Sequence, residues 1–339
     1  MPAAYDVYGI GHAVVDTQYA VDARTIARLG IEKGVMTLID EAGRARLLAG
    51  LPMAPARSAS GGSAANTLIA LTRFGGRAYF ACQVGDDDWG RFYRRDLDRA
   101  GVASSPAAHR SGATGQCLVL VTPDADRTMN TFLGVSAGMG PDQIEPEVVG
   151  ASRWVYLEGY LLSSGAGVAA CRLAQAEAHR QGHAVALTLS DPTIVGLFGQ
   201  AFEQVLDGGV DLLLCNEDEA RAITGQEDRG RAADALGSRV GAACITCGAD
   251  GALTIDAGGI VSVPGFRTAA VDTTGAGDAF AGGVLYGLTH GHPLASAATL
   301  GCYAAALVVS CFGPRLEETI GQRVEAILNR TAPLPTRGR

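Results

Sequence analysis

The sequence predicts an α/β protein: a doubly wound, mainly parallel sheet flanked by helices, with a small β-sheet lid. Apolar runs rich in β-branched residues recur along the chain, and several have apolar residues at consecutive positions. Such runs are typical of strands that are covered on both faces. Stretches that can form helices separate these runs, and alternating strands and helices imply a parallel sheet. Two stretches break the alternation and predict the lid.

The expected strands of the main sheet lie, in chain order, at residues 6–10, 78–84, 154–157, 184–189, 211–215 and 243–246. Residues 168–181 have apolar side chains at helical spacing and can form a crossover helix. Residues 296–309 are rich in alanine and are expected to form a buried helix. We expect a single domain over residues 1–330.

Residues 14–39 alternate in a strand-like way with little helical period, and residues 114–132 contain an apolar run followed by a Pro-Asp turn. Both are interpreted as lid strands, so the lid segments are expected at about 14–40 and 112–134. Residues 331–339 contain two prolines and a polar to basic end, and a flexible tail is expected there.

The composition excludes several classes of partner. Apolar residues make up 47% and charged residues 18% of the chain, against roughly 25% charged in typical soluble proteins, which favours a large buried core. The formal net charge of -8 provides no broad basic surface, so neither nucleic acid nor a membrane is expected as a partner. No signal peptide precedes the eight cysteines, and reduced thiols in a cytoplasmic protein are expected. Cys244 and Cys247 are a close pair, but no second pair or histidine cluster completes a metal site.

A glycine-rich turn at residues 272–278 leads directly into an apolar helix. The amides of Ala276, Gly277 and Asp278 lack intrahelical partners there, and together with the helix dipole they can hold a developing phosphoryl charge. Glycine at 275 and 277 lets a phosphate approach the backbone closely. Asp278 can accept the proton of a hydroxyl that attacks a γ-phosphate. The alternative is that Asp278 is an N-cap and the glycines form an ordinary tight turn.

A second glycine-rich element, Gly61-Gly62-Ser63-Ala64-Ala65-Asn66, precedes it in the chain. Together the two elements resemble the paired signatures of the PfkB, or ribokinase-like, family of carbohydrate and nucleoside kinases. The resemblance covers roughly residues 5–325, with Leu68 standing where the family usually has a small residue. It implies a ribokinase-like fold, ATP as co-substrate with Mg²⁺, and Gly275, Ala276 and Gly277 as an anion hole with Asp278 as the base.

Three further landmarks follow in the family's order. Asn216 and Glu219 resemble the Asn-x-x-Glu element that organises Mg²⁺ through water. The turn at 246–251, with its Thr246, Gly248 and Gly251, resembles one near the nucleotide. Asp272 and the carbonyl groups of residues 310–313 match where relatives hold a monovalent cation, which makes K⁺ a candidate cofactor.

Residues 9–16, 33–34, 38–40 and 127–131 resemble the adenosine-kinase branch of the family more than the ribokinase branch. The resemblance implies that Asp16 grips sugar hydroxyls and that Gly62, Ser63 and Asn66 complete the pocket. His12 stands where adenosine kinases usually have asparagine. As a neutral ring it can still donate one hydrogen bond and accept one, although a strand-end histidine without ligand contact is the alternative.

The expected reaction is ATP-dependent phosphorylation of a primary hydroxyl, with adenosine as the favoured acceptor and AMP and ADP as products. A sugar kinase of ribokinase or fructokinase type is the alternative, and a sensor that binds without turnover is a remote one. Arg127 can reach a nucleotide phosphate from the lid or lie solvated, and Phe132 and Phe198 are candidates for stacking on a purine. Lids in this family either stay free or pair between subunits, so both a monomer and a homodimer are compatible with the sequence.

Two other nucleotide-binding motifs do not match this sequence. Gly9-Ile10-Gly11 imitates a dinucleotide-binding turn, but residues 14–21 continue in extended style without a third glycine. A Walker-type loop needs a lysine after its glycines, and Lys33, which is the only lysine of the chain, is in a different setting.

Overall fold

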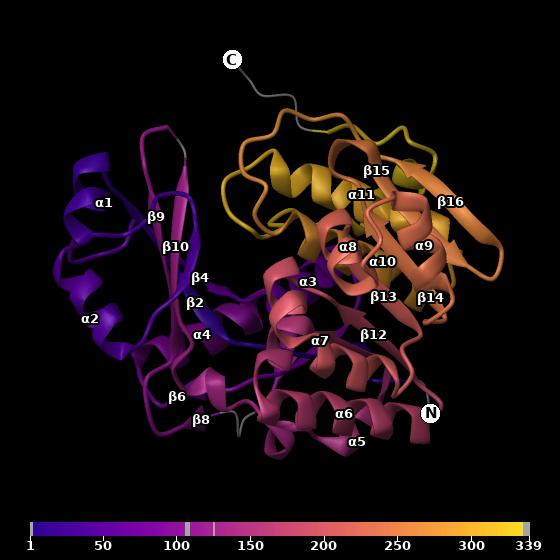
Figure 1. Cartoon of the computed structure of the whole chain (residues 1–339), viewed down its shortest axis with the longest axis horizontal. Helices are drawn as coiled ribbons and strands as arrows, with labels where there is room; N and C mark the ends of the chain where they lie inside the picture. The colour runs from indigo at the N-terminus through magenta and orange to yellow at the C-terminus, as the bar shows by residue number, and fades with distance from the viewer. Residues whose placement is uncertain (1–2, 106–108, 125, 335–339) are drawn as a thin grey trace.

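The computed structural model describes residues 3–105, 109–124 and 126–334. A nine-stranded sheet in the order β16-β15-β14-β13-β12-β11-β1-β5-β7 forms its larger part (Figure 1). The strands from β14 to β7 run parallel and the pairs β14–β15 and β15–β16 are antiparallel, which confirms the predicted fold class. The strands are β1 (Tyr5–Ile10), β5 (Ala78–Ala81), β7 (Val102–Ser104), β11 (Ser152–Glu158), β12 (Ala184–Thr188), β13 (Leu212–Asn216), β14 (Ala242–Thr246), β15 (Gly251–Asp256) and β16 (Gly259–Pro264).

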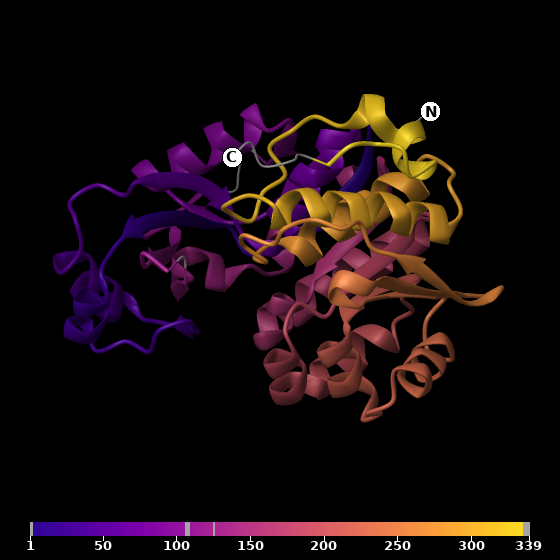
Figure 2. The same cartoon turned by 90° about the horizontal axis from the view of Figure 1, so that it is seen from above.

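Helices cover both faces of this sheet, as Figure 2 shows from above. Alternate strand side chains pack on opposite faces: Tyr8 and Leu213 belong to one buried cluster, and Val7 and Leu214 to the other. The first face packs against α5 (Pro146–Gly150), α6 (Gly165–Arg180), α7 (Pro192–Leu206), α8 (Glu217–Thr224) and α9 (Arg229–Gly237). The second packs against α3 (Ser63–Phe74), α4 (Asp88–Arg99), α10 (Ala276–Thr289) and α11 (Leu294–Val309).

The two helices expected from the sequence are present as α6 and α11. The strand predicted at 78–84 is instead two strands, because β5 ends at Ala81 and β6 (Val84–Gly85) pairs with β8 (His109–Arg110) in a separate small sheet. The short helices are α12 (Val324–Leu328) and the 3-10 turns η1 (Gly134–Gly138), η2 (Pro141–Gln143), η3 (Gly159–Ser163), η4 (Gly248–Asp250) and η5 (Gly321–Arg323).

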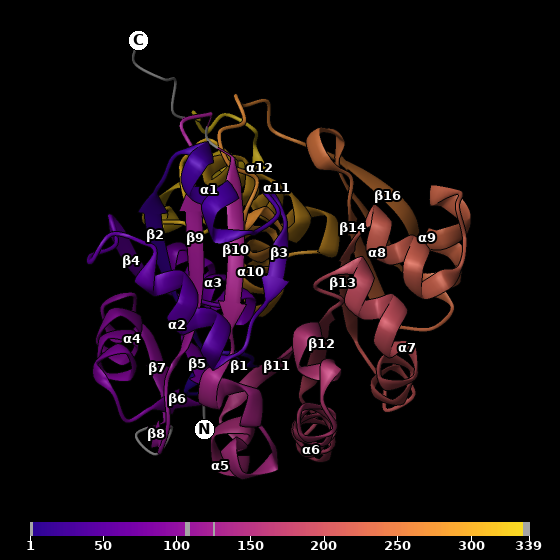
Figure 3. The same cartoon turned by 60° about the vertical axis from the view of Figure 1, so that its left-hand side comes forward.

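The smaller sheet stands beside the main sheet as a lid, on the left of Figure 1 and facing the viewer in Figure 3. Its order is β3-β10-β9-β2-β4. The strands are β3 (Met36–Leu38), β10 (Arg127–Phe132), β9 (Gly115–Val121), β2 (Val14–Ala20) and β4 (Arg57–Gly61). The first lid segment, which the sequence predicted at about residues 14–40, therefore continues through β4 to Gly61.

The prediction of strands alone at residues 14–39 is wrong, because α1 (Ala23–Leu29) lies within this stretch. The Asp22 carboxylate caps it by accepting a hydrogen bond from the Thr25 amide at 2.8 Å. Ile26 and Leu29 are its buried residues, and they pack with α2 (Glu41–Ala49) on one face of the lid sheet. The opposite face of the lid is thereby left to line a cleft.

The first part of the tail is packed rather than flexible. Ala332 is buried, and the carbonyl group of Pro333 accepts a hydrogen bond from the Tyr303 hydroxyl at 2.8 Å. The remainder of the predicted tail, residues 335–339, lies outside the described residues. Within the described ranges, no helix combines the length and apolarity that a membrane span needs.

Candidate active site

The carboxyl ends of the parallel strands carry polar side chains toward a single edge of the main sheet. In open α/β sheets this edge is where ligands bind. The residues at or just beyond these strand ends are His12 after β1, Glu158 of β11, Asn216 of β13 and Thr246 of β14.

Two clefts open along this edge. The lid cleft, of about 430 Å³, lies between the lid sheet and the strand ends and is lined by His12, Asp16, Asn66 and Asp278 among others. The outer cleft, of about 530 Å³, is lined by the 246–251 turn, residues 265–270 and α11. Three residues belong to the lining of both clefts, and they are Thr273, Ala276 and Gly277. The two clefts therefore meet at the start of α10.

The start of α10 has the form that the sequence predicts, with one correction. Gly275 is its N-cap with φ +77°, and a Cβ there would lie 2.2 Å from the carbonyl oxygen of Pro314. Only glycine fits this position. The Ala276 amide donates to the Thr273 carbonyl at 3.2 Å, whereas Gly277 and Asp278 stand in the first turn, where amides lack intrahelical acceptors. Because Gly275 is the N-cap, the alternative in which Asp278 merely caps this helix is wrong.

The carboxylate of Asp278 is held by two side chains from the other glycine-rich element. The Ser63 hydroxyl donates to Oδ1 at 2.7 Å, and the Asn66 side-chain amide donates to Oδ2 at 3.0 Å. Burial raises the pKa of Asp278 to about 6, and these two hydrogen bonds oppose that rise by stabilising the charged form. Asp278 is thus a fixed carboxylate whose proton affinity suits a general base near neutral pH.

Asp16 faces the lid cleft from β2, and its carboxylate makes no hydrogen bond to the described residues. Its carboxylate lies against Gly61, where a Cβ would be 2.3 Å from Oδ2. Burial raises the pKa of Asp16 to about 7, and the positive charges of Arg127 and Arg315 oppose that rise. The side-chain oxygen of Asn66 is also buried without a partner. The cleft therefore holds one carboxylate, that of Asp16, which is free to bind hydroxyl groups.

His12 belongs to the wall of this cleft rather than to the protein interior alone. Its Nδ1 lies 3.0 Å from the carbonyl oxygen of Ser136, and burial lowers the pKa of the ring, so the neutral form is favoured. Nδ1–H then donates to Ser136, and the backbone of Tyr160 also lies within hydrogen-bond reach of the ring. Gly62 follows the lid strand β4 with φ +101°, and a Cβ there would lie 2.2 Å from the His12 carbonyl oxygen.

Sequence reasoning missed Glu158, which is 1% exposed and lines the lid cleft. Its carboxylate accepts hydrogen bonds from the amides of His12 at 3.1 Å and Ala64 at 2.8 Å, so it ties β1 to the start of α3. Burial raises the pKa of Glu158 to about 7, and the two amide bonds oppose the rise. Its place at the carboxyl end of a parallel strand was the signal that could have identified it.

The aromatic residue that lines the lid cleft is Tyr160 of η3. Neither aromatic candidate from the sequence belongs to the lining of the two clefts. The guanidinium group of Arg44 lies over the ring of Phe132 instead, with 4.6 Å between Cζ of Arg44 and the ring centroid. Phe198 lies within α7. Neither Phe132 nor Phe198, the two candidates for stacking on a purine, therefore faces either cleft.

Arg127 joins the lid to the glycine-rich turn. Its guanidinium group forms an ion pair with Asp272, and the two side chains are only 9% and 5% exposed. The alternative in which Arg127 is solvated is therefore wrong. Nε of Arg127 is buried without a partner, and the side chain lines the lid cleft. Asp272 also accepts hydrogen bonds from the amides of Gly313 at 2.9 Å and Thr274 at 3.0 Å, so its carboxylate is already well satisfied.

Asn216 and Glu219 form a reciprocal capping box at the start of α8. The Asn216 oxygen accepts from the Glu219 amide at 2.8 Å, and the Glu219 carboxylate accepts from the backbone and side-chain amides of Asn216 at 3.0 and 2.8 Å. Both residues line the lid cleft. Burial raises the pKa of Glu219 to about 7. Within the described chain, no group of three or more acidic, cysteine or histidine side chains could hold a metal by itself.

One carboxylate with open lone pairs nevertheless suits Mg²⁺, which usually keeps several waters and takes one or two carboxylates together with substrate phosphates. Glu219 supplies such a carboxylate at the edge of the cleft.

The outer cleft contains the third predicted landmark. Thr246, Gly248 and Gly251 belong to its lining, together with apolar side chains that include Phe266 and Ala305. The cleft extends to Gly277, so a flat apolar group bound in it can direct a polar chain toward the first turn of α10.

Comparisons with known proteins agree with this geometry. The family model described as pfkB family carbohydrate kinase matches residues 55–320. The adenosine kinase of Saccharomyces cerevisiae is 28% identical over 326 residues, which cover 90% of this chain and 95% of that protein. Among solved structures, an adenosine kinase from Sinorhizobium meliloti matches with a TM-score of 0.87 and 35% identity, covering 96% of this chain and 99% of that one. A probable sugar kinase from Rhizobium etli matches with a TM-score of 0.88 and 31% identity over the same shares.

The match to the family model extends over most of the chain and includes both glycine-rich elements. This chain is therefore a kinase that belongs to the pfkB family of carbohydrate kinases.

Proposed function

We propose that this kinase transfers the γ-phosphoryl group of ATP to a primary hydroxyl of a nucleoside, with adenosine as the favoured acceptor. One observation carries the proposal: the two clefts share the first turn of α10, where Asp278 stands. An acceptor in the lid cleft and a nucleotide in the outer cleft would bring hydroxyl and γ-phosphate together at this carboxylate. Such an arrangement supplies orientation, which accounts for much of phosphoryl-transfer catalysis.

In this proposal each residue has a separate task. Asp278 accepts the hydroxyl proton, and the amides of Gly277 and Asp278, at the positive end of the α10 dipole, stabilise the charge on the transferred group. Glu219 with Asn216 would hold Mg²⁺ through water, and that ion would neutralise charge on the nucleotide phosphates. Thr246, Gly248 and Gly251 would contact the nucleotide.

At the acceptor end, Asp16 supplies a carboxylate for ribose hydroxyls, and Asn66 and neutral His12 would contact the acceptor from the wall of the cleft. Gly62 and Ser63 would border the reacting hydroxyl, since Ser63 touches Asp278. Arg127, whose side chain lines the lid cleft beside Asp272, would contact a phosphate that enters between the clefts.

The lid favours a nucleoside over a free sugar. Most side chains that the lid strands contribute to the cleft lining are apolar, namely Val14, Met36, Leu38, Cys117, Val119 and Met129, and the polar ones are Asp16, Arg127 and Thr131. A free sugar needs hydrogen bonds on most sides, whereas a nucleoside offers a ribose to the polar end and a flat base to the apolar end. Tyr160 adds an aromatic surface to the same cleft.

The test is ADP release from ATP across a panel of adenosine, inosine, ribose and fructose at matched concentrations. We expect the highest kcat/KM with adenosine. Greater turnover with ribose or fructose would instead identify a sugar kinase, in line with the Rhizobium etli neighbour's name. Tight acceptor binding without ADP release would identify a sensor.

A further inference from the structure

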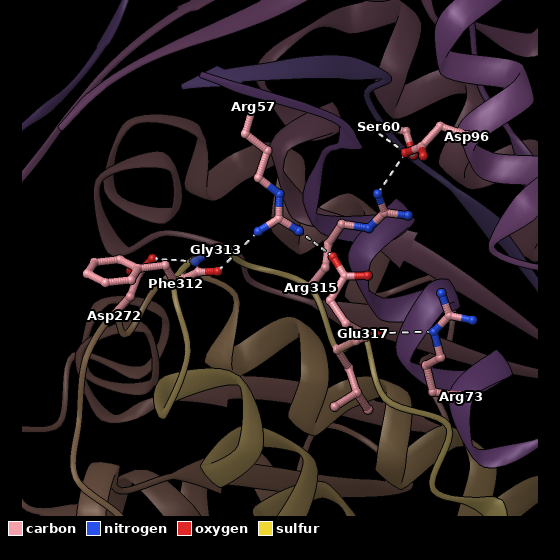
Figure 4. A network of polar contacts seen from close by, with 10 residues as sticks. Arg57, Ser60, Arg73, Asp96, Asp272, Phe312, Gly313, Arg315 and Glu317 are labelled. Carbon is pink, nitrogen blue, oxygen red and sulfur yellow. Dashed lines mark hydrogen bonds and ion pairs between the residues drawn. The ribbon is translucent and has the colours of Figure 1, made fainter. Parts of the chain in front are cut away.

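A loop that follows α11 reaches the lid, the glycine-rich turn and α4 at once (Figure 4). The Gly313 amide donates to Asp272, and Pro314 packs against Gly275. Arg315 extends from the same loop to Asp96 of α4, where Nη1 and Oδ2 are 2.7 Å apart. This segment therefore borders both the catalytic turn and the acceptor side of the site.

Arg315 is unusually well buried for an arginine, with 7% of its side chain exposed. Its partner oxygen in Asp96 also accepts hydrogen bonds from the amide and hydroxyl of Ser60, at 2.8 and 2.9 Å. Ser60 belongs to β4 and directly precedes Gly61 and Gly62. Arg315 and Asp96 thus hold the lid strand immediately before the turn that borders the acceptor.

Arg315 also shares a small cavity with Asp16, between the 313–315 segment and the lid strands. Nε of Arg315 is buried without a hydrogen-bond partner. Asp96 occupies one side of the guanidinium group, while the carboxylate of Asp16 makes no hydrogen bond to the described residues. The positive charge of Arg315 therefore acts on two partly buried carboxylates, and the second of them faces the cleft.

We propose that Arg315 is a positioning residue for acceptor binding: it places a buried positive charge beside Asp16 and, through Asp96, fixes the strand that carries the Gly61–Gly62 turn. The catalytic relevance of this role rests on the proposed function, in which Asp16 accepts hydrogen bonds from acceptor hydroxyls.

Several other groups near Asp16 also affect the ionisation of its carboxyl group. Arg127 from β10 favours the ionised form, and Asp278 from α10 opposes it. The thiol of Cys117 from β9 and the phenol of Tyr93 from α4 are also nearby, and burial raises the pKa of both, so they stay neutral.

The sign of the expected effect follows from this arrangement. Because a nearby cation stabilises a carboxylate, removing Arg315 raises the pKa of Asp16 above its already raised value. More of the protein then carries a protonated Asp16 at pH 7, and a protonated carboxyl group is a poorer acceptor for two hydroxyl groups.

The direct test is the titration of Asp16 itself, followed through the carboxyl carbon in protein labelled with ¹³C-aspartate. Asp16→Asn assigns the resonance. We expect Arg315→Met to raise the midpoint by about one pH unit, and Arg315→Lys to return it toward that of the native protein. An unchanged midpoint in Arg315→Met overturns the proposal. No acceptor is needed, so this result is independent of which substrate the kinase uses.

Arg73→Met is the matched control. Arg73 anchors the same loop by donating from Nε to the Leu316 carbonyl at 3.2 Å, but its charge is not among those that act on Asp16. We expect it to leave the Asp16 midpoint unchanged. An equal shift in Arg73→Met would show that loop displacement, rather than the charge of Arg315, is responsible.

Kinetics with adenosine and ATP provide the second readout. At pH 7 we expect Arg315→Met to raise the KM for adenosine about fivefold, because the ionised fraction of Asp16 falls by about that factor, with less effect at pH 9 and little change in kcat. A fall in kcat at constant KM would contradict the proposal.

If Arg315→Met does not fold, the variant R315M/D96N removes the same charge without leaving the partly buried Asp96 carboxylate without its charge partner. The same upward shift of the Asp16 midpoint is expected in this double variant, and its absence overturns the proposal.

Discussion

Ser63 and Asp278 are 215 residues apart in sequence, yet the Ser63 hydroxyl donates to the Asp278 carboxylate at 2.7 Å. This contact joins the two glycine-rich elements at the point where the two clefts meet. It also fixes the orientation of Asp278, because Asn66 holds the other carboxylate oxygen.

The first prediction concerns Asp278. We expect Asp278→Asn to lower kcat by about 10²–10⁴, as for a lost general base, while the KM for the acceptor changes little. Asp88→Asn is the control, since Asp88 also lies in the first turn of a helix but is 97% exposed at the surface. Steady-state ADP release measures both. Native-like turnover in Asp278→Asn would contradict the assignment of Asp278 as base.

The second prediction concerns how kcat depends on pH on the acidic side of its optimum, here called the acidic limb. Only the ionised carboxylate can accept a proton, and burial raises the pKa of Asp278 to about 6. Log kcat should therefore fall as the pH decreases through about 6. Ser63→Ala removes a hydrogen bond that stabilises the charged form, so the limb should move to higher pH. A limb that moves to lower pH, or does not move, would show that a different group titrates.

The glycine-rich turn provides a third prediction with an internal control. Gly275→Ala places a methyl group at φ +77° and 2.2 Å from the Pro314 carbonyl oxygen, so we expect the free energy of unfolding to fall by about 1–3 kcal/mol. Gly277→Ala meets no atom within 4 Å in the protein, so stability should be maintained. Its methyl group occupies the room that a phosphate needs, and kcat/KM should fall by about 10²-fold.

Urea denaturation and ADP release separate the two effects. If Gly277→Ala retains native activity, the phosphate does not approach this turn. If Gly275→Ala retains native stability, the backbone there does not need glycine.

The parts of this site that the sequence predicts are those whose chemistry is local. The 272–278 turn places glycine, free amides and a carboxylate within one helical turn, and such a pattern can be recognised from the sequence alone. Arg315 was missed because it gains its role only when distant segments meet, whereas Glu158 was missed although its place at the end of a predicted strand pointed to the ligand-binding edge of the sheet. The helix α1 was missed for another reason: it buries only Ile26 and Leu29, too few to produce a clear helical period.

A fourth prediction follows from the ion pair between Arg127 and Asp272. We propose that the guanidinium group and a monovalent cation compete for this carboxylate. In Arg127→Met the carboxylate keeps the Gly313 and Thr274 amides but loses its charge partner, so the variant should be destabilised. K⁺ should raise its Tm more than that of the native protein, measured against choline chloride at equal ionic strength. An equal response of both proteins to K⁺ would contradict competition at Asp272.

The fifth prediction tests what the lid recognises. Met129 lies on β10 with its side chain in the lining of the lid cleft, on the apolar face opposite α1 and α2. Met129→Thr keeps a residue that suits a strand but places a hydroxyl group against a bound base. Because part of an apolar side chain's burial is lost, we expect the KM for adenosine to rise about tenfold. The KM for ribose should stay unchanged, since ribose would occupy the polar end beside Asp16.

Met53→Thr, at a fully exposed position, controls for the loss of a methionine. Equal increases for adenosine and ribose would show that Met129 supports the lid itself rather than the base.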